Sequence, residues 1–381
     1  MKLQQLESLP IEWKRGNGFR KSDLNEDGKN KCILYGELYT KHKNVLIGSN
    51  TISRTNKIGA FCSRKGDILV PGTSTASKKD MLLAREIDED GVFLGGDINV
   101  IRPKQGIFAK KYLPYFFETS FAYDQLDRYI TGATGIIHIS NTGIKKLKVP
   151  LPNLQEQQHI VAILDEAFSA IDKAKANTEQ NLKNVKELFE RTKSEIFDKL
   201  KGEKVLIATV CNEIFAGGDA PKDYSKEKNE KHNIPIIANA VKDNGLYGYS
   251  NRERVSLPSI TIAARGSGTG HTEIRYEPFF PIVRLIVLTP NTEKITLEFL
   301  KYSVQNLDIL SSGSAIPQLT VPMLKEYAIS LPPIKDQQTI VSKLDALREQ
   351  TKKLEAVYEK KLQDLEELKK SVLSKAFSGE L

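Results

Sequence analysis

Residues 151–165 read LPNLQEQQHIVAILD, and residues 331–345 read LPPIKDQQTIVSKLD. The two stretches match without a gap at an offset of 180 residues, and 8 of their 15 positions are identical. The match extends further, because Ser194 and Phe197 fall opposite Ser374 and Phe377 at the same offset. A repeat at a fixed offset indicates that one structural unit occurs twice in the 381-residue chain.

Each copy of the repeat is predicted to open a long amphipathic helix. Proline stands ahead of each helix, at position 152 and at positions 332 and 333, where a helix entry tolerates it. Apolar residues then recur at steps of three and four, and neither stretch contains proline or glycine before Gly202 and Gly379. A helix of about 45 residues is about 65–70 Å long, close to two turns of DNA.

An apolar stripe on so long a helix needs a partner along its length, because it would otherwise expose a large apolar surface. Two matching stripes in one chain supply that partner. We therefore expect the helices to pair as a coiled coil, rather than to lie apart as unrelated surface helices. Antiparallel pairing is favoured, because a folded domain connects the end of one helix to the start of the other.

Two globular segments accompany the helices and are rich in short β-type runs separated by turn signals. These runs are residues 32–35, 67–70, 260–263 and 282–288. The sequence therefore predicts an α+β fold, in which two globular mixed domains are separated by two long antiparallel coiled-coil helices, with pseudo-twofold symmetry. The predicted segments are 1–150 for the first domain, 151–202 for the central helix, 203–330 for the second domain and 331–381 for the distal helix.

The two globular segments also resemble each other faintly. The similar stretches are residues 16–23 with 217–223, residues 67–74 with 260–267, and residues 132–134 with 313–315. The helices are thus similar while the domains have diverged, which suggests a shared scaffold that carries two different binding domains.

Positive charge is distributed unevenly along the chain. The net charge is +8, and residues 1–153 contain 24 Lys and Arg against 16 Asp and Glu. Residues 203–333 contain 14 of each sign. If the chain binds nucleic acid, we expect the first domain to contribute more of the salt-dependent affinity.

Composition excludes several classes of protein. With 40% hydrophobic and 27% charged residues, the chain is not disordered throughout, and no apolar run approaches the ~20 residues that span a bilayer. The start lacks an apolar signal-peptide core, and the three cysteines are far apart, so we expect a cytoplasmic protein. The five histidines show no metal-ligand spacing, so no metal site is predicted.

Catalytic motifs are not evident. The loop at residues 266–270, GSGTG, lacks the third glycine of a dinucleotide loop, because His271 occupies that position. A structural turn is the favoured interpretation, with a DNA-backbone contact or a cofactor loop as alternatives. Residues 367–369, ELK, match the end of a nuclease site but fall on the distal helix, where a solvated helix face explains them. We predict no catalytic residue.

In these features the chain resembles the specificity (S) subunits of type I restriction-modification systems. The resemblance rests on the two LPxxxxQQ-I-V helix entries, the long helices behind them, the Gly-(Ala/Ser) turn ahead of each LP, and the ending SKAFSGEL at residues 374–381. It covers essentially the whole chain. The lead before Gly16 is shorter than in some relatives, so we expect reduced N-terminal contacts with the scaffold.

The resemblance implies that each globular segment is a target-recognition domain that reads one half of a split, asymmetric DNA site. It implies that the helices set the spacing of the half-sites and dock two methyltransferase (M) subunits, and restriction (R) subunits through them. This chain would bind no cofactor. S-adenosylmethionine, ATP and magnesium would belong to the partner subunits, in a system of host defence against foreign DNA.

Two alternatives remain open. A stand-alone DNA-binding scaffold or regulator could have the same coiled-coil plan. The chain could also be an enzyme whose motif is not recognised. The adenine methyltransferase of such a system should show a glycine-rich cofactor loop and an Asn/Asp-Pro-Pro-aromatic element for a flipped adenine, and the sequence has no such tetrapeptide.

Candidate DNA-binding residues are those that could donate to phosphates or to base edges. In the first domain they are Lys21, Ser22, Lys41, Lys43, Arg54, Lys57, Arg64, Thr73, Ser74, Thr75, Lys78 and Lys79. In the second domain they are Asn239, Lys242, Asn244, Tyr247, Tyr249, Asn251, Arg252, Arg254, Arg265, Ser267, Thr269 and His271.

Overall fold

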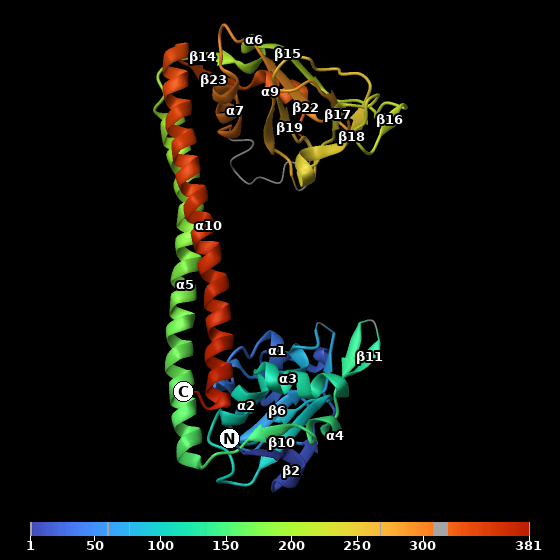
Figure 1. Ribbon diagram of the computed structural model, residues 1–381, viewed down its shortest axis with the longest axis vertical. Helices are drawn as coiled ribbons and strands as arrows, with labels where there is room; N and C mark the ends of the chain where they lie inside the picture. Colours follow the sequence, from blue (N-terminus) through green and yellow to red (C-terminus); the bar gives the residue numbers. More distant parts are fainter. Residues whose placement is uncertain are drawn as a thin grey trace. The chain divides into compact units, whose positions relative to one another are not determined.

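The computed structural model describes residues 2–58, 61–75, 77–133, 135–266, 268–307 and 319–380. It forms two compact units, which we call unit 1 (residues 1–179 and 360–381) and unit 2 (residues 180–359). Two helices of 45 residues each, α5 (Leu154–Asp198) and α10 (Ile334–Ser378), contribute to both units (Figure 1). Both helices begin and end inside the segments predicted for them.

Unit 1 is a mixed α+β domain built on a five-stranded sheet, as the sequence predicted. The order of that sheet is β2 (Ile11–Arg15), β10 (Ile98–Pro103), β6 (Asp67–Pro71), β8 (Arg85–Ile87) and β4 (Leu46–Ile47). Two smaller sheets are β5 (Ser53–Thr55), β3 (Asn30–Ile33) and β9 (Phe93–Leu94), and β11 (Thr131–Ala133), β12 (Ile136–His138) and β7 (Thr73–Ser74). The helices of the domain are α1 (Glu37–Thr40), α2 (Tyr112–Phe117), α3 (Ser120–Leu126) and α4 (Asn141–Ile144).

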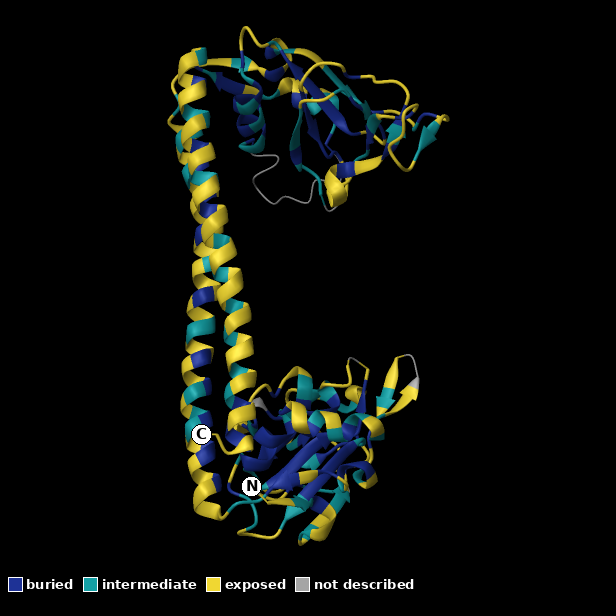
Figure 2. Ribbon diagram, viewed as in Figure 1, coloured by how far each residue is buried: buried dark blue, intermediate teal, exposed yellow. Residues whose placement is uncertain are grey.

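The central strands of unit 1 are apolar because both of their faces are covered. Every residue of β6 is buried, and so are the first four residues of β10 (Figure 2). A strand buried on both sides loses the polar-apolar alternation of a surface strand and becomes a continuous apolar run, such as ILV at residues 68–70. This is why these runs could be predicted from the sequence.

The short N-terminal lead is part of the fold of unit 1. Residues Leu3–Gln5 form β1, which pairs antiparallel with β13 (Lys148–Pro150), the strand that leads into α5. Leu6 follows β1 and is fully buried in the main core of the unit. The lead therefore fixes the chain segment from which the central helix begins.

Unit 2 has two four-stranded sheets and a helix-rich end. One sheet has the order β15 (Cys211–Ala216), β22 (Ile286–Pro290), β19 (Ser259–Ile262) and β20 (Thr272–Arg275). The other has the order β16 (Tyr224–Ser225), β18 (Leu246–Ser250), β17 (Ile234–Ile237) and β21 (Phe280–Pro281). The unit also contains a two-stranded pair, β14 (Glu203–Leu206) with β23 (Ala328–Leu331). Its helices are α6 (Ile207–Val210), α7 (Leu297–Gln305) and α9 (Val321–Glu326).

The two units share one strand topology. The order β15-β22-β19-β20 in unit 2 corresponds to β2-β10-β6-β8 in unit 1, with every neighbouring pair antiparallel in both. β17 pairs antiparallel with β18 and parallel with β21, just as β3 pairs with β5 and β9. The pair β14–β23 leads into α10 as β1–β13 leads into α5. The faint sequence similarity of the domains therefore reflects a duplicated fold.

One predicted strand is only half correct. Residues 282–288 were expected to be one continuous run, but β22 begins at Ile286. Val283 and Arg284 have positive φ angles of 53° and 60°, which ends the strand geometry there. Their amides donate to the carbonyls of Gly218 (2.7 Å) and Gly217 (2.9 Å), so the glycine pair after β15 holds this turn. The run at 32–35 is likewise shorter, because β3 ends at Ile33.

Within each unit, the helical segments pack antiparallel, as predicted. In unit 1, Lys175 Nζ lies 2.6 Å from Glu366 Oε1, and Lys369 Nζ lies 4.8 Å from the ring centre of Phe168. Residue numbers therefore rise along α5 as they fall along α10 (Figure 1). Leu373, Ala376 and Phe377 of α10 are buried in the same core as the first domain, so the end of the distal helix is part of that domain.

Unit 2 repeats this packing with other residues. Arg348 of α10 lies over the ring of Phe189 of α5, at 4.8 Å from the ring centre. Phe189 and Leu344 are buried together with Tyr302 of α7 in one cluster, to which Ile196 also packs. The start of α10 therefore anchors to the second domain in the way that the start of α5 anchors to the first.

Candidate nucleic-acid interface

One buried glutamine joins the first domain to α5. Gln157 is 1% exposed, and its Oε1 accepts a hydrogen bond from the backbone N–H of Ala109 at 2.9 Å. Its Nε2 donates to the carbonyls of Ile107 (3.1 Å) and Pro152 (3.0 Å). The side chain thus links the helix entry to the loop ahead of α2 and satisfies three buried backbone groups.

Gln337 does the same in unit 2. It is fully buried, its Oε1 accepts from the N–H of Thr296 at 2.9 Å, and its Nε2 donates to the carbonyls of Lys294 and Pro332, each at 2.9 Å. The identity of this glutamine in the two repeats was visible in the sequence, but its function as a latch between domain and helix was not.

A tyrosine–aspartate pair reinforces each junction. The hydroxyl of Tyr115 donates to Asp165 in unit 1, and the hydroxyl of Tyr302 donates to Asp345 in unit 2, both at 2.6 Å. Burial raises the pKa of both phenols, and the neighbouring carboxylate raises it further. Each phenol therefore remains a hydrogen-bond donor at neutral pH.

Among the identical positions of the repeat, Gln158 and Gln338 differ from the rest. Both side chains are exposed, and neither makes a hydrogen bond with a described residue. The other identical residues support the fold, through the latch at Gln157 and Gln337, the bonds to Asp165, or burial in the core. The fold of the described chain therefore gives no reason for keeping this glutamine twice.

Three of the predicted DNA-binding lysines in unit 1 are held by carboxylates. Lys57 lies 2.6 Å from Asp23 and Lys78 lies 2.7 Å from Asp127, and these hydrogen bonds lower the pKa of both aspartates. Lys41 donates to Ser53 and lies 3.5 Å from Glu37. Exposed ion pairs of this kind are weak, but they reduce the charge that these lysines offer to a phosphate.

The other predicted cations of the first domain differ in whether they bond to other groups of the chain. Lys21, Lys43, Arg64 and Lys79, with the hydroxyl of Ser22, are exposed and form no ion pair with a described residue. Arg54 instead holds a loop, since its Nε donates to the carbonyl of Gly28 at 2.6 Å.

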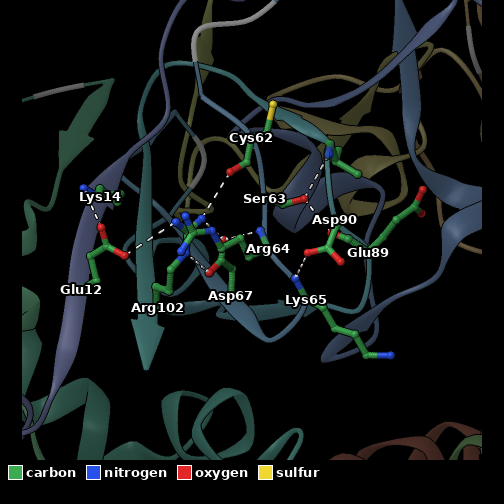
Figure 3. A network of polar contacts seen from close by, with 11 residues as sticks. Glu12, Lys14, Cys62, Ser63, Arg64, Lys65, Asp67, Glu89, Asp90 and Arg102 are labelled. Atoms are coloured by element: carbon green, nitrogen blue, oxygen red, sulfur yellow. Dashed lines mark hydrogen bonds and ion pairs between the residues drawn. The ribbon is translucent and has the colours of Figure 1, made fainter. Parts of the chain in front are cut away.

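Figure 3 shows why the loop that carries Arg64 keeps its shape. Asp67 is 1% exposed and accepts two hydrogen bonds from the guanidinium of Arg102, each at 2.7 Å. The same carboxylate accepts the backbone N–H of Arg64 at 2.8 Å. This buried network fixes the loop backbone, so the exposed side chain of Arg64 projects from a rigid base.

The predicted hydroxyl donors lie mostly inside the fold. Thr73 and Ser74 form β7 and are 5% and 0% exposed, and Thr73 Oγ1 lies 3.0 Å from Nδ1 of His138. Because both residues are buried, their hydroxyls do not face solvent. Of the three, Thr75 alone is exposed.

In unit 2 the predicted stretch 239–254 is a shaped loop followed by a strand. Asn239 accepts the backbone N–H of Ala264 and donates to the carbonyl of Arg265 at 2.9 Å, which attaches the loop to the end of β19. A 3-10 turn, η6 (Lys242–Gly245), follows, in which Asp243 and Asn244 are left-handed. Asp and Asn tolerate this backbone better than most residues. Lys242 and Asn244 are exposed on the turn.

A partly exposed aromatic cluster lies on β16 and β18. The rings of Tyr247 and Tyr224 are 5.4 Å apart, and Lys226 Nζ lies 3.7 Å from the ring centre of Tyr247. Tyr224 and Lys226 were not among the predicted residues, although the stretch YSK at 224–226 offers an aromatic ring beside a cation. Flat rings with a nearby cation suit contact with bases and phosphates.

Two arginines of the stretch lie over aromatic rings rather than beside acids. Arg252 lies 5.6 Å from the ring centre of Phe280, and Arg254 lies 4.4 Å from that of Phe215. Both are exposed and form no ion pair with a described residue, so no described carboxylate offsets their charge. Asn251 instead donates to Asp223 at 3.3 Å.

The second predicted loop of unit 2 is a turn between β19 and β20. The N–H of Thr269 donates to the carbonyl of Gly266 at 3.1 Å, and His271 Nε2 lies 3.2 Å from Glu273. Arg265 is exposed, and Ser267 lies outside the described residues. These contacts fit the structural-turn interpretation of GSGTG.

The described residues contain no cluster of three or more His, Cys, Asp and Glu side chains that could hold a metal ion. Each helix among them is too short or too polar to span a lipid bilayer. The three cysteines are free thiols, and burial raises the pKa of Cys32 to about 11 and that of Cys211 to about 12. At neutral pH these two are protonated and poorly reactive.

Comparison with known proteins gives the family. A family model described as the type I restriction modification DNA specificity domain matches residues 6–187 and 206–366. S.MpnORF89P of Mycoplasma pneumoniae is 37% identical over 141 residues, which are 37% of this chain and 42% of that protein. S.MpnORF507P of the same organism is 35% identical over 138 residues, 36% of this chain and 38% of that protein. The chain spans less than half the length of these two relatives.

Solved structures share the fold. A chain from a structure of the type I R-M system, described for its complex assembly and conformational transition, has a TM-score of 0.81 at 19% identity and covers 100% of this chain and 98% of its own. The HsdS subunit from Thermoanaerobacter tengcongensis has a TM-score of 0.63 at 19% identity, covering 100% and 97%. Because the family model matches most of the chain in two successive stretches, the chain belongs to the family of type I restriction-modification specificity subunits.

Proposed function

We propose that this chain is the DNA sequence-specificity subunit of a type I restriction-modification complex. Each globular domain, residues 1–150 and 203–330, would read one half of a split, asymmetric DNA site. The observation that carries this proposal is the duplicated junction. The same glutamine latch and tyrosine–aspartate pair join each long helix to a domain of one strand topology, while the exposed side chains of the two domains differ. A constant scaffold with two variable faces suits a reader of two unlike half-sites.

The two domains would contact DNA in different ways. The unpaired cations of unit 1, among them Lys21, Lys43 and Lys79, suit contacts to phosphates, which position the protein without reading sequence. The exposed, flat guanidinium groups of Arg252 and Arg254 in unit 2 suit planar contacts to base edges.

The chain itself would be non-catalytic and would act in the cytoplasm. The methyl transfer to adenine N6, using S-adenosylmethionine, would take place on methyltransferase subunits. ATP and magnesium would serve the restriction subunits. The helices would set the distance between half-sites.

We further propose that two methyltransferase subunits dock at the two helix entries, through Gln158 and Gln338. These exposed, identical side chains have no hydrogen bond within the described chain, so an external partner that occurs twice explains their identity. In native mass spectrometry with the methyltransferase, the wild type should carry two copies, Gln158→Ala or Gln338→Ala one, and the double variant none. Gln155→Ala and Lys335→Ala, exposed and unlike in the two repeats, are the matched controls. Two copies on the double variant would contradict this assignment.

The central test of the function is methylation-sensitive sequencing of DNA from cells with and without this gene and its partner methyltransferase. A split, asymmetric methylated motif should disappear when the gene is deleted. Methylation that stays unchanged without the gene would refute the proposed function. Exchanging residues 203–330 for those of another specificity subunit should change one half of the motif and leave the other half intact.

A further inference from the structure

Unit 2 contains a cavity of about 690 Å³ that none of the contacts above explains. It lies between η6, β17, β18 and residues 274–279. Ile237 and Phe279, which are 4% and 1% exposed, supply buried apolar lining. Tyr249 and Tyr276 add aromatic surface. The volume falls in the range of roughly 300–1,000 Å³ that is typical of small-molecule sites.

Arg275 lines this cavity with part of its hydrogen-bonding capacity unused. Its Nη2 donates to the carbonyl of Asn244 at 2.6 Å, and its Nε donates to Thr261 Oγ1 at 3.2 Å. A guanidinium has five N–H donors, so three of them bond to no described residue, and no described carboxylate forms an ion pair with the group. Burial lowers the pKa of Arg275, because few opposite charges offset its loss of water.

The charges around the cavity are balanced, which restricts the class of ligand. The lining residues include two cations, Lys228 and Arg275, and two acids, Asp243 and Glu277. The amides of Asn233 and Asn244 add uncharged donors and acceptors. Lining acids repel a phosphate, so an anion does not fit the whole site. A neutral, flat ring with polar edges fits both the aromatic surfaces and the mixed polar groups.

The position of Tyr276 also suits a stacked ligand. Its side chain is 60% exposed, and its hydroxyl donates to Glu298 of α7 at 3.1 Å. The ring is therefore held at one end while much of its surface remains open to solvent. A ring that is fixed without being covered provides a stacking surface.

We propose that this cavity binds a nucleobase, stacked on tyrosine and hydrogen-bonded by Arg275 and the neighbouring amides. The proposal rests on the proposed function, since Asn244 and Tyr249 belong to the stretch expected to face DNA. The base would come from a duplex, turned out of its stack, with the sugar-phosphate chain left outside the cavity. A free nucleotide has the same ring chemistry and is the second source that the experiment separates.

The first arm of the test measures duplex binding by fluorescence anisotropy, with the full chain and the DNA site established by methylation sequencing. Turning a base out of the stack costs less free energy when that base is mismatched, because fewer pairing contacts are lost. One mismatched position in the half-site of unit 2 should therefore tighten wild-type binding by about tenfold, equivalent to about 1.4 kcal/mol. Tyr276→Ala should abolish this gain and also weaken binding to the matched duplex, because the surface on which the base stacks is removed. Tyr358→Ala, which removes a tyrosine on α10 outside the cavity, should behave as the wild type.

The second arm titrates the four deoxynucleoside monophosphates into the same proteins by calorimetry. Binding that Tyr276→Ala abolishes, without a mismatch effect in the duplex, assigns the cavity to a free nucleotide. A mismatch effect alone assigns it to a DNA base. Neither signal in the wild type, or equal signals in Tyr276→Ala, overturns the nucleobase proposal. If the wild type binds its matched duplex normally in that case, the proposed function stands. If it binds no duplex specifically, the proposed function fails.

Discussion

Gln157 in unit 1 and Gln337 in unit 2 each bond one backbone N–H and two carbonyls at the entry of a long helix, yet the domains behind them have different surfaces. Unit 1 combines exposed lysines that are partly neutralised by acids with others that are not. In unit 2, Arg252 and Arg254 lie on aromatic rings. The junction is therefore what the duplication preserved, and the surface chemistry is what diverged.

We expect the largest effect when the glutamine junction that both units share is removed. Gln157→Leu leaves three buried backbone groups without partners, and Gln337→Leu does the same in unit 2. An unsatisfied buried group costs about 1–3 kcal/mol, so with three such groups each variant should lose at least about 3 kcal/mol of unfolding free energy in its own unit. The single tryptophan, Trp13, lies in β2 of unit 1, so its fluorescence follows that unit in a urea titration, while circular dichroism follows both.

Gln157→Leu should shift the Trp13 transition, and Gln337→Leu should shift only the circular-dichroism signal of unit 2. Gln155→Leu, at an exposed position on the same helix entry, should shift neither. An equal displacement of the Trp13 transition by both latch variants would show that the two units unfold together, and the comparison of separate junctions would then fail.

A smaller expected effect is that the stability of unit 1 depends on pH. His42 of unit 1 is 3% exposed, and burial lowers its pKa from 6.5 to about 4. Below pH 6.5 the unfolded chain therefore binds a proton that the folded unit excludes, so stability falls as the pH falls toward 4. Between pH 7.5 and pH 5 the loss should be about 2 kcal/mol, measured by the Trp13 transition.

The variant His42→Leu should remove most of this pH dependence, whereas His159→Gln, an exposed histidine on α5, should retain it. Acid sensitivity that is unchanged in His42→Leu would assign the effect to other groups. The window stays above pH 5 because the carboxylates that are bonded to lysines, such as Asp23 and Asp127, begin to titrate at lower pH.

The long helices could be predicted because their signal is local. An apolar residue recurs every three or four positions along 45 residues, and the same pattern occurs in both copies of the repeat. Strand order could not be predicted, because pairing partners such as β2 and β10 are some 85 residues apart. The local sequence pattern does not indicate which strands pair. The duplicated glutamine was conspicuous in the sequence, but its latch function depends on backbone groups of a loop that precedes it by about 50 residues.

The candidate DNA-binding residues show the same limit. Residue type indicated which side chains could contact a phosphate, but pairing and burial are properties of the fold. Lys78 meets Asp127 across 49 positions. Thr73 is buried in a strand that pairs with β12, which the sequence around residue 73 does not reveal. The turn at Val283 and Arg284 was missed because an apolar run normally predicts a strand, whereas the Gly217–Gly218 pair after β15 holds a left-handed backbone there.

The smallest expected effect concerns how the two surfaces bind DNA. Lys79 in unit 1 is exposed and forms no ion pair with a described residue, so Lys79→Gln should remove one phosphate contact and lower the slope of log K against log salt by about 0.9. Lys78→Gln is the matched control, because its partner Asp127 already offsets the charge, and the slope should change less. Anisotropy titrations from 50 to 300 mM salt, a range of roughly sixfold, measure both.

Arg254→Lys is the opposite case, because it keeps the charge and removes the flat, forked guanidinium that lies on Phe215. The salt slope should stay constant while affinity for the cognate site falls by about fivefold, or about 1 kcal/mol, and affinity for unrelated DNA remains the same. If Arg254→Lys lowers the salt slope as Lys79→Gln does, both surfaces bind through charge alone. The difference between a positioning domain and a planar-reading domain would then disappear, and with it the expectation that unit 1 contributes the larger share of the salt dependence.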